Sequence, residues 1–416
     1  MESGQQLAKS TAAALRRRRV LIIVENLPCP FDRRVWQEAC TLRAAGYEVS
    51  IICPKGKGYE RHFEEIDGIA IWRHPQPFEG DGPLGYAAEY AWALLAEFVL
   101  SLKVLATRGF DVIHACNPPD TLFLIGGFYK LFGKKFLFDH HDINPELYEA
   151  KFRRRDVFYK LMLRLERWTF RTADVCVATN ESYRRIAIER GGREPSKVFV
   201  VRSGPDLSRL RILPPSPELK NGRRYLVGYV GVMGRQEGID GLLTAVHHIV
   251  YDLQRHDVQF GLVGGGTELE ALRARARALQ IDPYVTFTGR VPDATLLAML
   301  NTADVCVNPD VANEMNDKST MNKVMEYMAL GKPVVQYDLT EGRVSAQEAS
   351  LYAKPNDPID LARKIVLLLD DEALRERMGR LGRERVQNVL SWEHEAPHLL
   401  AAYEALFEAP ARRGGG

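Results

Sequence analysis

The chain has 416 residues, of which 46% are hydrophobic and 26% charged, and its formal net charge is +2. This length exceeds one ordinary core and predicts two domains of about 200 residues each. The composition is typical of a soluble globular enzyme, and the nearly balanced charge gives no reason to expect a nucleic-acid partner. The six cysteines lie far apart with no C-x-x-C pair, so neither a zinc site nor a disulfide framework is indicated, which favours a reducing cytoplasm.

Residues 1–19 are predicted to form a basic tail without the apolar stretch of a signal peptide. The most hydrophobic window, residues 86–106, is interrupted by Glu89, Glu97 and Lys103. We therefore expect a long, mostly buried helix there, not a membrane span. The expected localisation is cytoplasmic, with the inner face of the membrane as an alternative place within it.

Short β-branched runs alternate with helical patterns from Val20 onward, which predicts parallel sheets covered by helices on both faces. In the first half, a helix is expected over 31–45 and strands over 20–24, 49–53, 70–73, 112–115, 135–138, 175–178 and 198–201. In the second half, strands are expected over 225–230, 258–263, 285–288, 304–307 and 333–337.

The domain boundaries follow from this alternation. We predict an N-terminal Rossmann-like domain over 20–206, a linker over 207–224 that carries three prolines, and a C-terminal Rossmann-like domain over 225–390. A final helix over 391–409 is expected to pack across the junction. The fold class is thus α/β, with two parallel-sheet domains facing each other across a cleft and ligands at the carboxyl ends of the strands.

Residues 318–335, KSTMNKVMEYMALGKPVV, form the most informative segment. A short helix between two apolar strands carries Lys323 and Glu326, which share a face because they are three residues apart. A cation there can reach a diphosphate, while a carboxylate can accept two vicinal ribose hydroxyls. The polar loop 310–320 opens the helix, whose N-terminal amides can face an anion. The segment predicts a nucleotide-sugar site, and the competing interpretation is a surface ion pair.

Residues 231–238, GVMGRQEG, follow the first strand of the second half. Their three glycines let the backbone approach a ligand phosphate, although a tight turn would need them equally. Neither half has the G-x-G-x-x-G that a dinucleotide-dependent dehydrogenase places after its first strand.

Residues 138–146, FDHHDINPE, follow a strand of the first half and are expected at its carboxyl end. A histidine of this segment is a credible site residue. We expect His140 to be structural. The two histidines and Asp142 also suggest a metal site, but neighbouring side chains on an extended backbone point apart. Because no third ligand is suggested, we expect no metal.

Five segments in this order and spacing, 203–206, 231–238, 262–270, 285–291 and 318–335, together resemble the retaining glycosyltransferases of family 4 with the GT-B fold. The resemblance extends from about residue 20 to 407. It implies transfer of a sugar from a nucleoside-diphosphate-sugar, expected to be a UDP-sugar, to a glycan or lipid-linked acceptor in polysaccharide biosynthesis. It also implies front-face substitution in which the departing phosphate helps to take the acceptor proton. No cofactor is expected beyond the nucleotide-sugar co-substrate.

The resemblance also implies residue roles. The expected catalytic residues are His141, near the reacting sugar, and Lys323. The expected donor-binding residues are Glu326, Lys318, Ser319, Thr320, Met321, Gly231, Val232, Arg235, Arg290 and Val291. On the acceptor side we expect Asp32, Arg33 and Asp142.

The sequence departs from the family at three of its charged positions. The usual arginine and lysine of the glycine-rich loop are Val232 and Glu237 here, and the first glutamate of the family's pair is Lys318. Without a D-x-D triplet for a metal, protein cations must neutralise the leaving diphosphate. We expect Lys323 to do so first, followed by Lys318 and Arg235.

Two further segments leave alternatives open. In the first segment, Asp32, Arg33 and Arg34 could contact the acceptor or a phosphate. The alternative is that the two arginines only form the exposed first turn of a helix. Residues 151–168 mix basic and large apolar side chains, which suits either a helix at an anionic membrane surface or, slightly favoured, a core helix with a solvated basic face. The alternative functions are a UDP-sugar epimerase and a non-catalytic nucleotide-sugar-binding partner.

Overall fold

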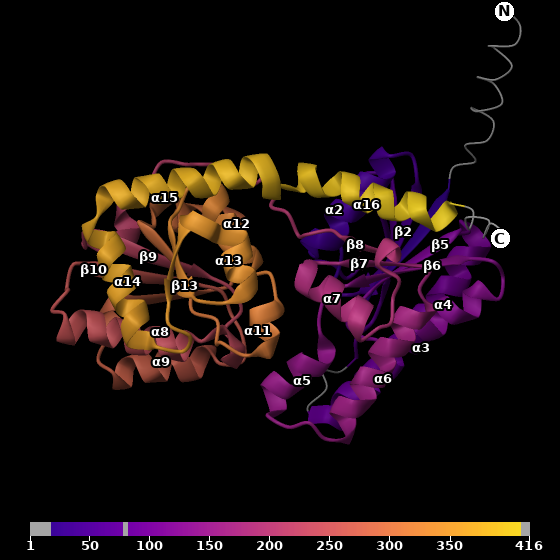
Figure 1. The fold of residues 1–416 in the computed structure, drawn as a ribbon, viewed down its shortest axis with the longest axis horizontal. Coiled ribbons are helices and arrows are strands. Elements are labelled where there is room, and N and C mark those ends of the chain that lie inside the picture. The colour runs from indigo at the N-terminus through magenta and orange to yellow at the C-terminus, as the bar shows by residue number, and fades with distance from the viewer. Residues whose placement is uncertain (1–17, 78–81, 409–416) are drawn as a thin grey trace, which may run out of the picture. The chain divides into compact units, whose positions relative to one another are not determined.

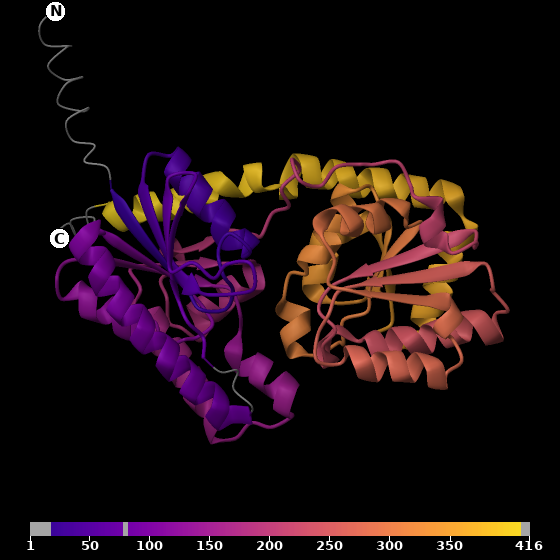
Figure 2. The same cartoon turned by 180° about the vertical axis from the view of Figure 1, so that it is seen from behind.

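The computed structural model describes residues 18–77 and 82–408 (Figures 1 and 2). The chain divides into two compact units. The first contains Met1–Glu149, Arg154–Val201 and Ala396–Gly416, and the second contains Ala150–Arg153 and Arg202–Glu395. Each has a parallel sheet covered by helices, which confirms the expected two-domain α/β fold. The predicted basic tail lies outside the described residues except for its last two.

The first unit is built on an eight-stranded sheet of order β3-β4-β2-β1-β5-β6-β7-β8, in which only β3 runs antiparallel to its neighbour. The sequence prediction omitted β3, because its side chains alternate between exposed and half-buried and form no apolar run. The strands are β1 (Arg19–Val24), β2 (Glu48–Pro54), β3 (Phe63–Ile66), β4 (Ile69–His74), β5 (Val112–Cys116), β6 (Lys135–His140), β7 (Val175–Ala178) and β8 (Val198–Val200).

Helices cover both faces of this sheet. Figure 1 shows α2 and α16 along one face and α3, α4 and α6 along the other. The final helix, α16, begins in the second unit and ends in the first. The helices are α2 (Arg33–Ala44), α3 (Gly82–Thr107), α4 (Phe123–Lys130), α5 (Asn144–Phe152), α6 (Val157–Thr172), α7 (Glu181–Glu189) and α16 (Trp392–Phe407), with a 3₁₀ turn at Pro195–Lys197.

The expectation that the hydrophobic window is mostly buried is wrong. Ala87–Thr107 of α3 has a mean hydropathy of 1.5, yet only 22% of it is buried. By length and composition alone it is the one helix among the described residues that could cross a membrane. It nevertheless packs against β2 and β4, and the side that does so includes Glu97. A stripe of one helix is enough to cover these strands, so the rest of α3 stays exposed.

The second unit has a six-stranded, fully parallel sheet of order β11-β10-β9-β12-β13-β14. Five of its strands lie within one residue of the predicted bounds, and β14 was not predicted. The strands are β9 (Tyr225–Val230), β10 (Val258–Val263), β11 (Val285–Gly289), β12 (Val305–Asn308), β13 (Val334–Tyr337) and β14 (Ser350–Ala353).

Two hydrophobic clusters fill the two faces of this second sheet, one under α8 and α14 and the other under α10 and α12. The helices are α8 (Ile239–His247), α9 (Leu269–Ala278), α10 (Asp293–Thr302), α11 (Glu314–Lys318), α12 (Asn322–Ala329), α13 (Thr340–Ala346), α14 (Pro358–Asp370) and α15 (Glu372–Arg385). Short 3₁₀ or π turns lie at Pro217–Lys220, Arg235–Glu237, His248–Asp252, Asp282–Tyr284, Gln347–Ala349 and Val386–Leu390.

The segment expected to be a linker, residues 207–224, is fixed to the second unit. Leu210 is 2% exposed within the cluster under α10 and α12. The amides of Leu213 and Ser216 donate to the side chains of Asn301 and Thr302, at 3.0 and 2.8 Å. The proline-containing segment is therefore packed against the second unit and is not a flexible linker.

In each sheet the strand order reverses direction at one place, between β1 and β5 in the first and between β9 and β12 in the second. Loops that leave neighbouring strands at such a point diverge to opposite faces, which opens a crevice at the carboxyl edge. The predicted site residues follow these strands or their neighbours.

Candidate functional site

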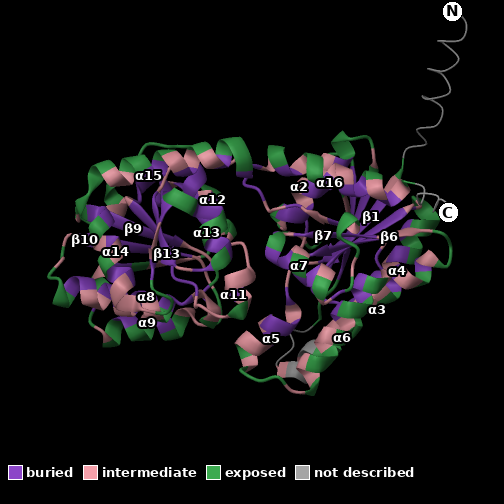
Figure 3. Cartoon of the chain, in the orientation of Figure 1, coloured by how far each residue is buried: buried purple, intermediate pink, exposed green. Residues whose placement is uncertain are grey.

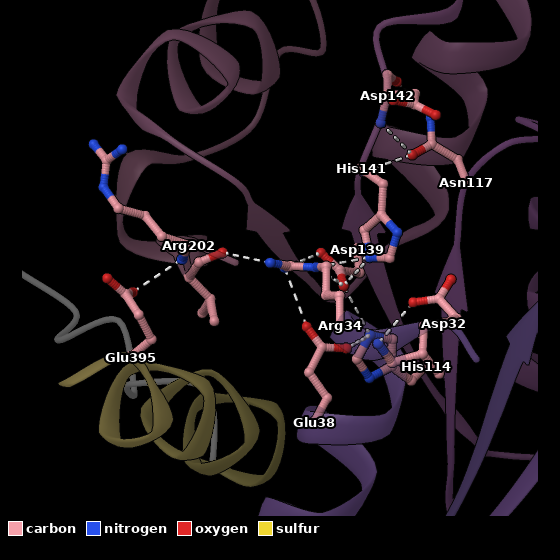
Figure 4. A network of polar contacts seen from close by, with 12 residues as sticks. Asp32, Arg34, Glu38, His114, Asn117, Asp139, His141, Asp142, Arg202 and Glu395 are labelled. Atoms are coloured by element: carbon pink, nitrogen blue, oxygen red, sulfur yellow. Dashed lines mark hydrogen bonds and ion pairs between the residues drawn. The ribbon is translucent and has the colours of Figure 1, made fainter. Parts of the chain in front are cut away.

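A buried ion pair joins α2 to β6 in the first unit (Figure 4). Arg34 Nε and Nη2 donate to the two carboxylate oxygens of Asp139 at 3.2 and 2.9 Å, and Nη1 donates to the carbonyl of Val201 at 2.9 Å. Asp139 is fully buried and the side chain of Arg34 is 7% exposed. The bidentate geometry matches the fork of a guanidinium to a carboxylate. The interpretation of Arg34 as part of an exposed first turn is wrong, because the residue is buried and donates to Asp139 and Val201, whereas its contact with acceptor or phosphate stays a prediction.

Burial and the neighbouring groups shift the pKa values of the ionisable residues around this pair. Burial would raise the pKa of Asp139, but the Arg34 guanidinium and His141 hold it well below its usual range. Burial, reinforced by Asp139, raises the pKa of Glu38 well above its usual value, and burial lowers the pKa of His114. His114 Nδ1 lies 2.9 Å from the hydroxyl of Tyr403 on α16. These shifts favour the charged forms of Asp139 and Arg34 and the neutral forms of Glu38 and His114.

His141 lies at the edge of this cluster with its side chain 15% exposed. Its Nε2 is 2.9 Å from Arg34 Nε and 2.5 Å from Asp139 Oδ2. One ring nitrogen cannot accept from Arg34 and donate to Asp139 at once. The protonation of Nε2 thus selects its partner, and either partner fixes the plane of the ring.

The turn after β6 is held by Asn117, which follows β5. Its Oδ1 accepts the amides of His141 and Asp142 at 2.7 and 3.1 Å, and its Nδ2 donates to Asp120 and to the carbonyl of Asp142. Asn117 was not among the residues predicted from the sequence. Its position could have been noticed in the sequence, because Asn117 is a polar residue directly after the apolar strand β5, and β5 neighbours β6, the strand that His141 follows.

Other first-unit residues have plainer roles. Asp32 caps α2 by accepting the amide of Val35 at 3.1 Å, and Arg33 is exposed on the first turn. His140 is fully buried, with Nε2 3.6 Å from Glu166. It points away from His141, as the extended backbone predicts.

Four possible metal ligands meet here, contrary to the expectation that no third ligand is available. Ligand atoms of Glu38, Cys116, Asp139 and His141 lie within 4.8 Å of one another. A metal does not fit them well, because the Arg34 guanidinium already contacts three of the four. Burial also raises the pKa of Cys116 well above its usual value, which keeps the thiol protonated.

In the second unit, two glycine-rich loops pack backbone to backbone at the carboxyl ends of β9 and β10. The amides of Gly231 and Met233 donate to the carbonyls of Val263 and Gly265, both at 3.0 Å. A Cβ on Gly264 would lie 1.8 Å from the carbonyl oxygen of Gly231. This approach explains why glycine is needed at 264, where φ is +138°.

Lys323 on α12 turns into this edge and pairs with two acids. Its Nζ lies 2.6 Å from Glu237, which follows β9, and 2.7 Å from Asp310, which follows β12. Burial would lower the pKa of Lys323, but Asp310, Tyr229 and Glu237 raise it well above its usual value. Burial raises the pKa of Asp310 to about 7 despite Lys323. The acid at 237 is therefore compensated by a cation from α12.

Glu326, one turn further along α12, has a different partner. Its Oε1 accepts a hydrogen bond from Nη2 of Arg209, whose Nη1 lies 3.4 Å from Asp293. The side chain of Glu326 is 16% exposed. Sequence reasoning missed Arg209 because it lies in the proline-containing segment that was assigned to a linker.

The residues before α12 are engaged locally. The predicted loop 310–320 contains the five-residue helix α11, capped by Asn313, so it is not a simple polar loop. Lys318 Nζ pairs with Glu314 at 2.6 Å, Ser319 Oγ donates to the carbonyl of Met315, Thr320 Oγ1 accepts from Arg202 and Met321 packs against the hydrophobic cluster.

The remaining donor-side residues lie on the surface of the second unit near the glycine-rich loops. Arg235, the expected substitute cation, has an 84% exposed side chain and pairs with Glu268 at 3.2 Å instead of joining Lys323. Val232 is 54% exposed, Arg290 is exposed beside Gly265 and Val291 is partly buried.

Comparison with protein-family models finds two matches. A model described as "Glycosyl transferase 4-like domain" matches residues 32–204, and one described as "Glycosyl transferases group 1" matches residues 224–371. The two matches lie in different halves of the chain, and the second includes Glu237, Asp310, Lys323 and Glu326.

Curated relatives are also glycosyltransferases. The 2-deoxystreptamine glucosyltransferase of Streptomyces kanamyceticus is 28% identical over 259 residues, which cover 59% of this chain and 64% of that relative's length. The glycogen synthase of Mycobacterium tuberculosis is 25% identical over 399 residues, which cover 92% of this chain and 91% of the relative. The phosphatidyl-myo-inositol mannosyltransferase of Mycobacterium leprae is 34% identical over 173 residues, 41% of this chain and 44% of the relative.

Solved structures share the GT-B fold. The sucrose-phosphate synthase of Thermosynechococcus elongatus has a TM-score of 0.76 and 22% identity, covering 94% of this chain and 99% of that one. HepE of Anabaena, in complex with UDP and glucose, has a TM-score of 0.71 and 16% identity, covering 93% and 100%. WaaG, a glycosyltransferase involved in lipopolysaccharide biosynthesis, has a TM-score of 0.68 and 16% identity, covering 91% and 98%.

Proposed function

Because this chain belongs to the family 4 glycosyltransferases with the GT-B fold, we propose that it is a retaining transferase that moves a sugar from a UDP-sugar to a glycan or lipid-linked acceptor. Glycosyl transfer follows from the family. The donor, the stereochemistry and the acceptor are the proposal. HepE was solved with UDP and glucose and supports the choice of a UDP-sugar.

The observation that carries the proposal is the placement of Lys323 and Glu326 on α12. Lys323 lies at the strand-order reversal of the second sheet, beside the glycine-rich loops. A leaving diphosphate gains negative charge in the transition state, and a fixed ammonium group stabilises that charge without reorganising. We propose that the carboxylate of Glu326 exchanges its contact with Arg209 for two vicinal ribose hydroxyls when the donor binds.

In the first unit, we propose that His141 contacts the sugar that is transferred. Its ring is oriented by Asp139 and Arg34, both buried, so its Nδ1 edge can hydrogen-bond a sugar hydroxyl without loss of side-chain entropy on binding. Proton transfer from the acceptor needs no strong protein base in this mechanism, because the departing phosphate takes the proton. Asp139 and Arg34 act as positioning residues.

We propose that the protein uses no cofactor or resident metal, and that its own cations neutralise the diphosphate. The proposed location is the cytoplasm at the inner face of a membrane, where a lipid-linked acceptor in polysaccharide biosynthesis would be presented. Asp32, Arg33 and Asp142 remain the proposed acceptor-side residues.

A donor panel tests the proposal. Release of nucleotide is measured for UDP-, GDP- and ADP-sugars, with and without a lipid extract, and the anomeric configuration of the product is read by NMR. We expect acceptor-dependent release of UDP, retention of configuration and activity that survives EDTA. Conversion of the UDP-sugar without acceptor would indicate an epimerase, and binding without turnover would indicate a non-catalytic partner.

A further inference from the structure

Helix α3 exposes a stripe of large apolar side chains, while its buried side holds Glu97 and Ser101 together with the smaller apolar residues Ala93 and Val104. On its inner side, Glu97 and Ser101 are both 0% exposed. The outer stripe, at helical spacing, lies between 40% and 58% exposed and consists of Trp92, Leu95, Val99 and Leu102. A surface helix ordinarily shows the reverse arrangement. The outer face of α3 therefore calls for a non-aqueous environment.

Helix α4 and the turn after it continue the apolar surface. Leu131 and Phe132 are 82% and 65% exposed. The ring of Phe128 on α4 lies 5.2 Å from that of Phe98 on α3, and Phe123 at the start of α4 lies 5.9 Å from Trp168 on α6. These ring contacts join the three helices, which lie on the same side of the first sheet (Figures 1 and 3), and we call their outer side the α3–α4–α6 face.

Helix α6 adds positive charge. Its outer side carries, at helical spacing, the exposed residues Val157, Lys160, Leu161, Arg164, Arg167, Trp168 and Arg171. The four cations make no ion pair with any described residue. Glu166 is the one acid of α6, and it is buried against Arg190. Unpaired cations between large apolar side chains match the phosphates and acyl chains of lipids.

We propose that the α3–α4–α6 face docks on an anionic lipid bilayer. The apolar side chains enter the boundary between headgroups and acyl chains, Trp92 and Trp168 occupy the interfacial zone, and the α6 cations meet lipid phosphates. Charge complementarity favours this occupant over a second copy of the chain, because a symmetric pairing would bring the cations of two α6 helices together. The proposal is independent of which sugar the protein transfers.

Vesicle sedimentation with the full chain tests the proposal. Phosphatidylcholine vesicles with and without phosphatidylglycerol are compared at about 0.1 M and about 0.5 M salt. We expect binding to the anionic vesicles, several-fold weaker at the higher salt, and little binding to the neutral ones. Equal binding to both kinds of vesicle, or to neither, would overturn the proposal.

Variants separate the two contributions. One replaces Leu131 and Phe132 by serine, and the other replaces Lys160, Arg164, Arg167 and Arg171 by glutamine. Each should weaken binding to anionic vesicles at least about tenfold, because each removes one of the two forces that hold a peripheral helix. Transfer to a water-soluble acceptor should be unchanged, since none of these residues belongs to the candidate site.

Matched controls lie on the second unit. They are Ile212→Ser with Val389→Ser for the apolar change, and glutamine at Arg277, Arg363, Arg377 and Arg380 for the charge change, all at exposed positions. Both should bind vesicles like the unaltered chain. Controls that lose as much as the test variants would contradict docking through this face. So would sedimentation velocity showing a dimer that Leu131→Ser with Phe132→Ser dissociates, because a second copy would then cover it.

Discussion

Arg34 and Asp139, 105 residues apart in the chain, form a bidentate ion pair in the interior of the first unit, and His141 rests against both. The pair fastens the start of α2 to the end of β6. It therefore holds a structural element and the imidazole of the candidate site in one arrangement.

Asp139→Asn should destabilise the first unit strongly. The amide cannot neutralise Arg34, so the buried guanidinium keeps only Glu38, 3.1 Å from Nη2, as an acidic neighbour, and the cost should reach about 3 to 5 kcal/mol if Glu38 stays protonated. Urea unfolding with a probe in the first unit measures the loss. Glu65→Gln is the control, because its pair with Arg108 is 40–48% exposed and should contribute less than about 1 kcal/mol. Equal losses would mean that the buried pair adds nothing special.

His141→Ala should reduce transfer far more than nucleotide binding, because the histidine is assigned to the sugar and not to the nucleotide. Single-turnover rates and calorimetry with UDP separate the two. His140→Ala is the comparison: it leaves a cavity against Phe138, Phe170 and Tyr183 and should lower stability instead. If His141→Ala lowered rate and UDP affinity equally, its role would be structural.

The alternation of strands and helices and the helix α12 could be predicted from the sequence, because the patterns that indicate them are local. Strand runs such as 225–230 and the three-residue spacing of Lys323 and Glu326 need no knowledge of the rest of the chain. The partners could not be predicted in the same way. Glu237 and Arg209 reach α12 from segments 86 and 117 residues away in the chain, and the local pattern around α12 gives no sign of them.

Burial of α3 was misjudged for a physical reason. Composition gives the apolar content of a helix but not how many of its sides are covered. β2 and β4 pack against the stripe that carries Glu97, and α4 contacts α3 through Phe98 and Ser101, so the remaining sides of the helix stay exposed. The sequence also favoured, slightly, a core helix with a solvated basic face for residues 151–168. In the structure this stretch is split between α5 and α6, and three large apolar side chains of α6 are exposed with its cations.

Glu25 should make stability depend on pH. It follows β1, is 3% exposed, and burial together with Glu89 raises its pKa from 4.5 to about 7. Between pH 4.5 and 7 the native state therefore holds a proton that the unfolded chain has released, so the free energy of unfolding falls as pH rises through this window and stays lower above it.

Glu25→Gln removes this titration. Relative to the unaltered chain, the variant should gain about 1 to 3 kcal/mol between pH 5 and pH 8. Denaturant unfolding at the two pH values measures the difference, with Glu48→Gln, at the exposed start of β2, as control. A difference that does not change with pH would show that Glu25 is ionised in the native state.

Glu326→Gln should keep the fold and weaken UDP binding by about 1.5 to 3 kcal/mol, because an amide cannot offer two anionic acceptors to vicinal hydroxyls. Calorimetry with UDP provides the measurement. Asp293→Asn removes the charge of the other partner of Arg209. Because the side chain of Asp293 is 51% exposed, this change should alter the affinity by less than about 0.5 kcal/mol. Unchanged affinity in Glu326→Gln would remove Glu326 from the nucleotide site.

Lys323→Ala should lower the rate of transfer at least about tenfold, or ~1.4 kcal/mol, because it removes the cation and leaves Glu237 and Asp310 beside the leaving diphosphate. Single-turnover rates measure the loss. Lys318→Ala is the control, since Lys318 pairs with Glu314 on α11 and should lose less.

The same residues allow the cation to be moved. In the double variant Lys323→Ala with Glu237→Lys, the positive charge comes from the glycine-rich loop and can still neutralise Asp310. We expect it to recover about tenfold of the lost rate, whereas Glu237→Lys alone places two ammonium groups at one acid and should disturb binding by repulsion. Circular dichroism confirms that each variant is folded. If the folded double variant is no faster than Lys323→Ala, the rate depends on Lys323 in particular and not on a positive charge at this edge of the sheet.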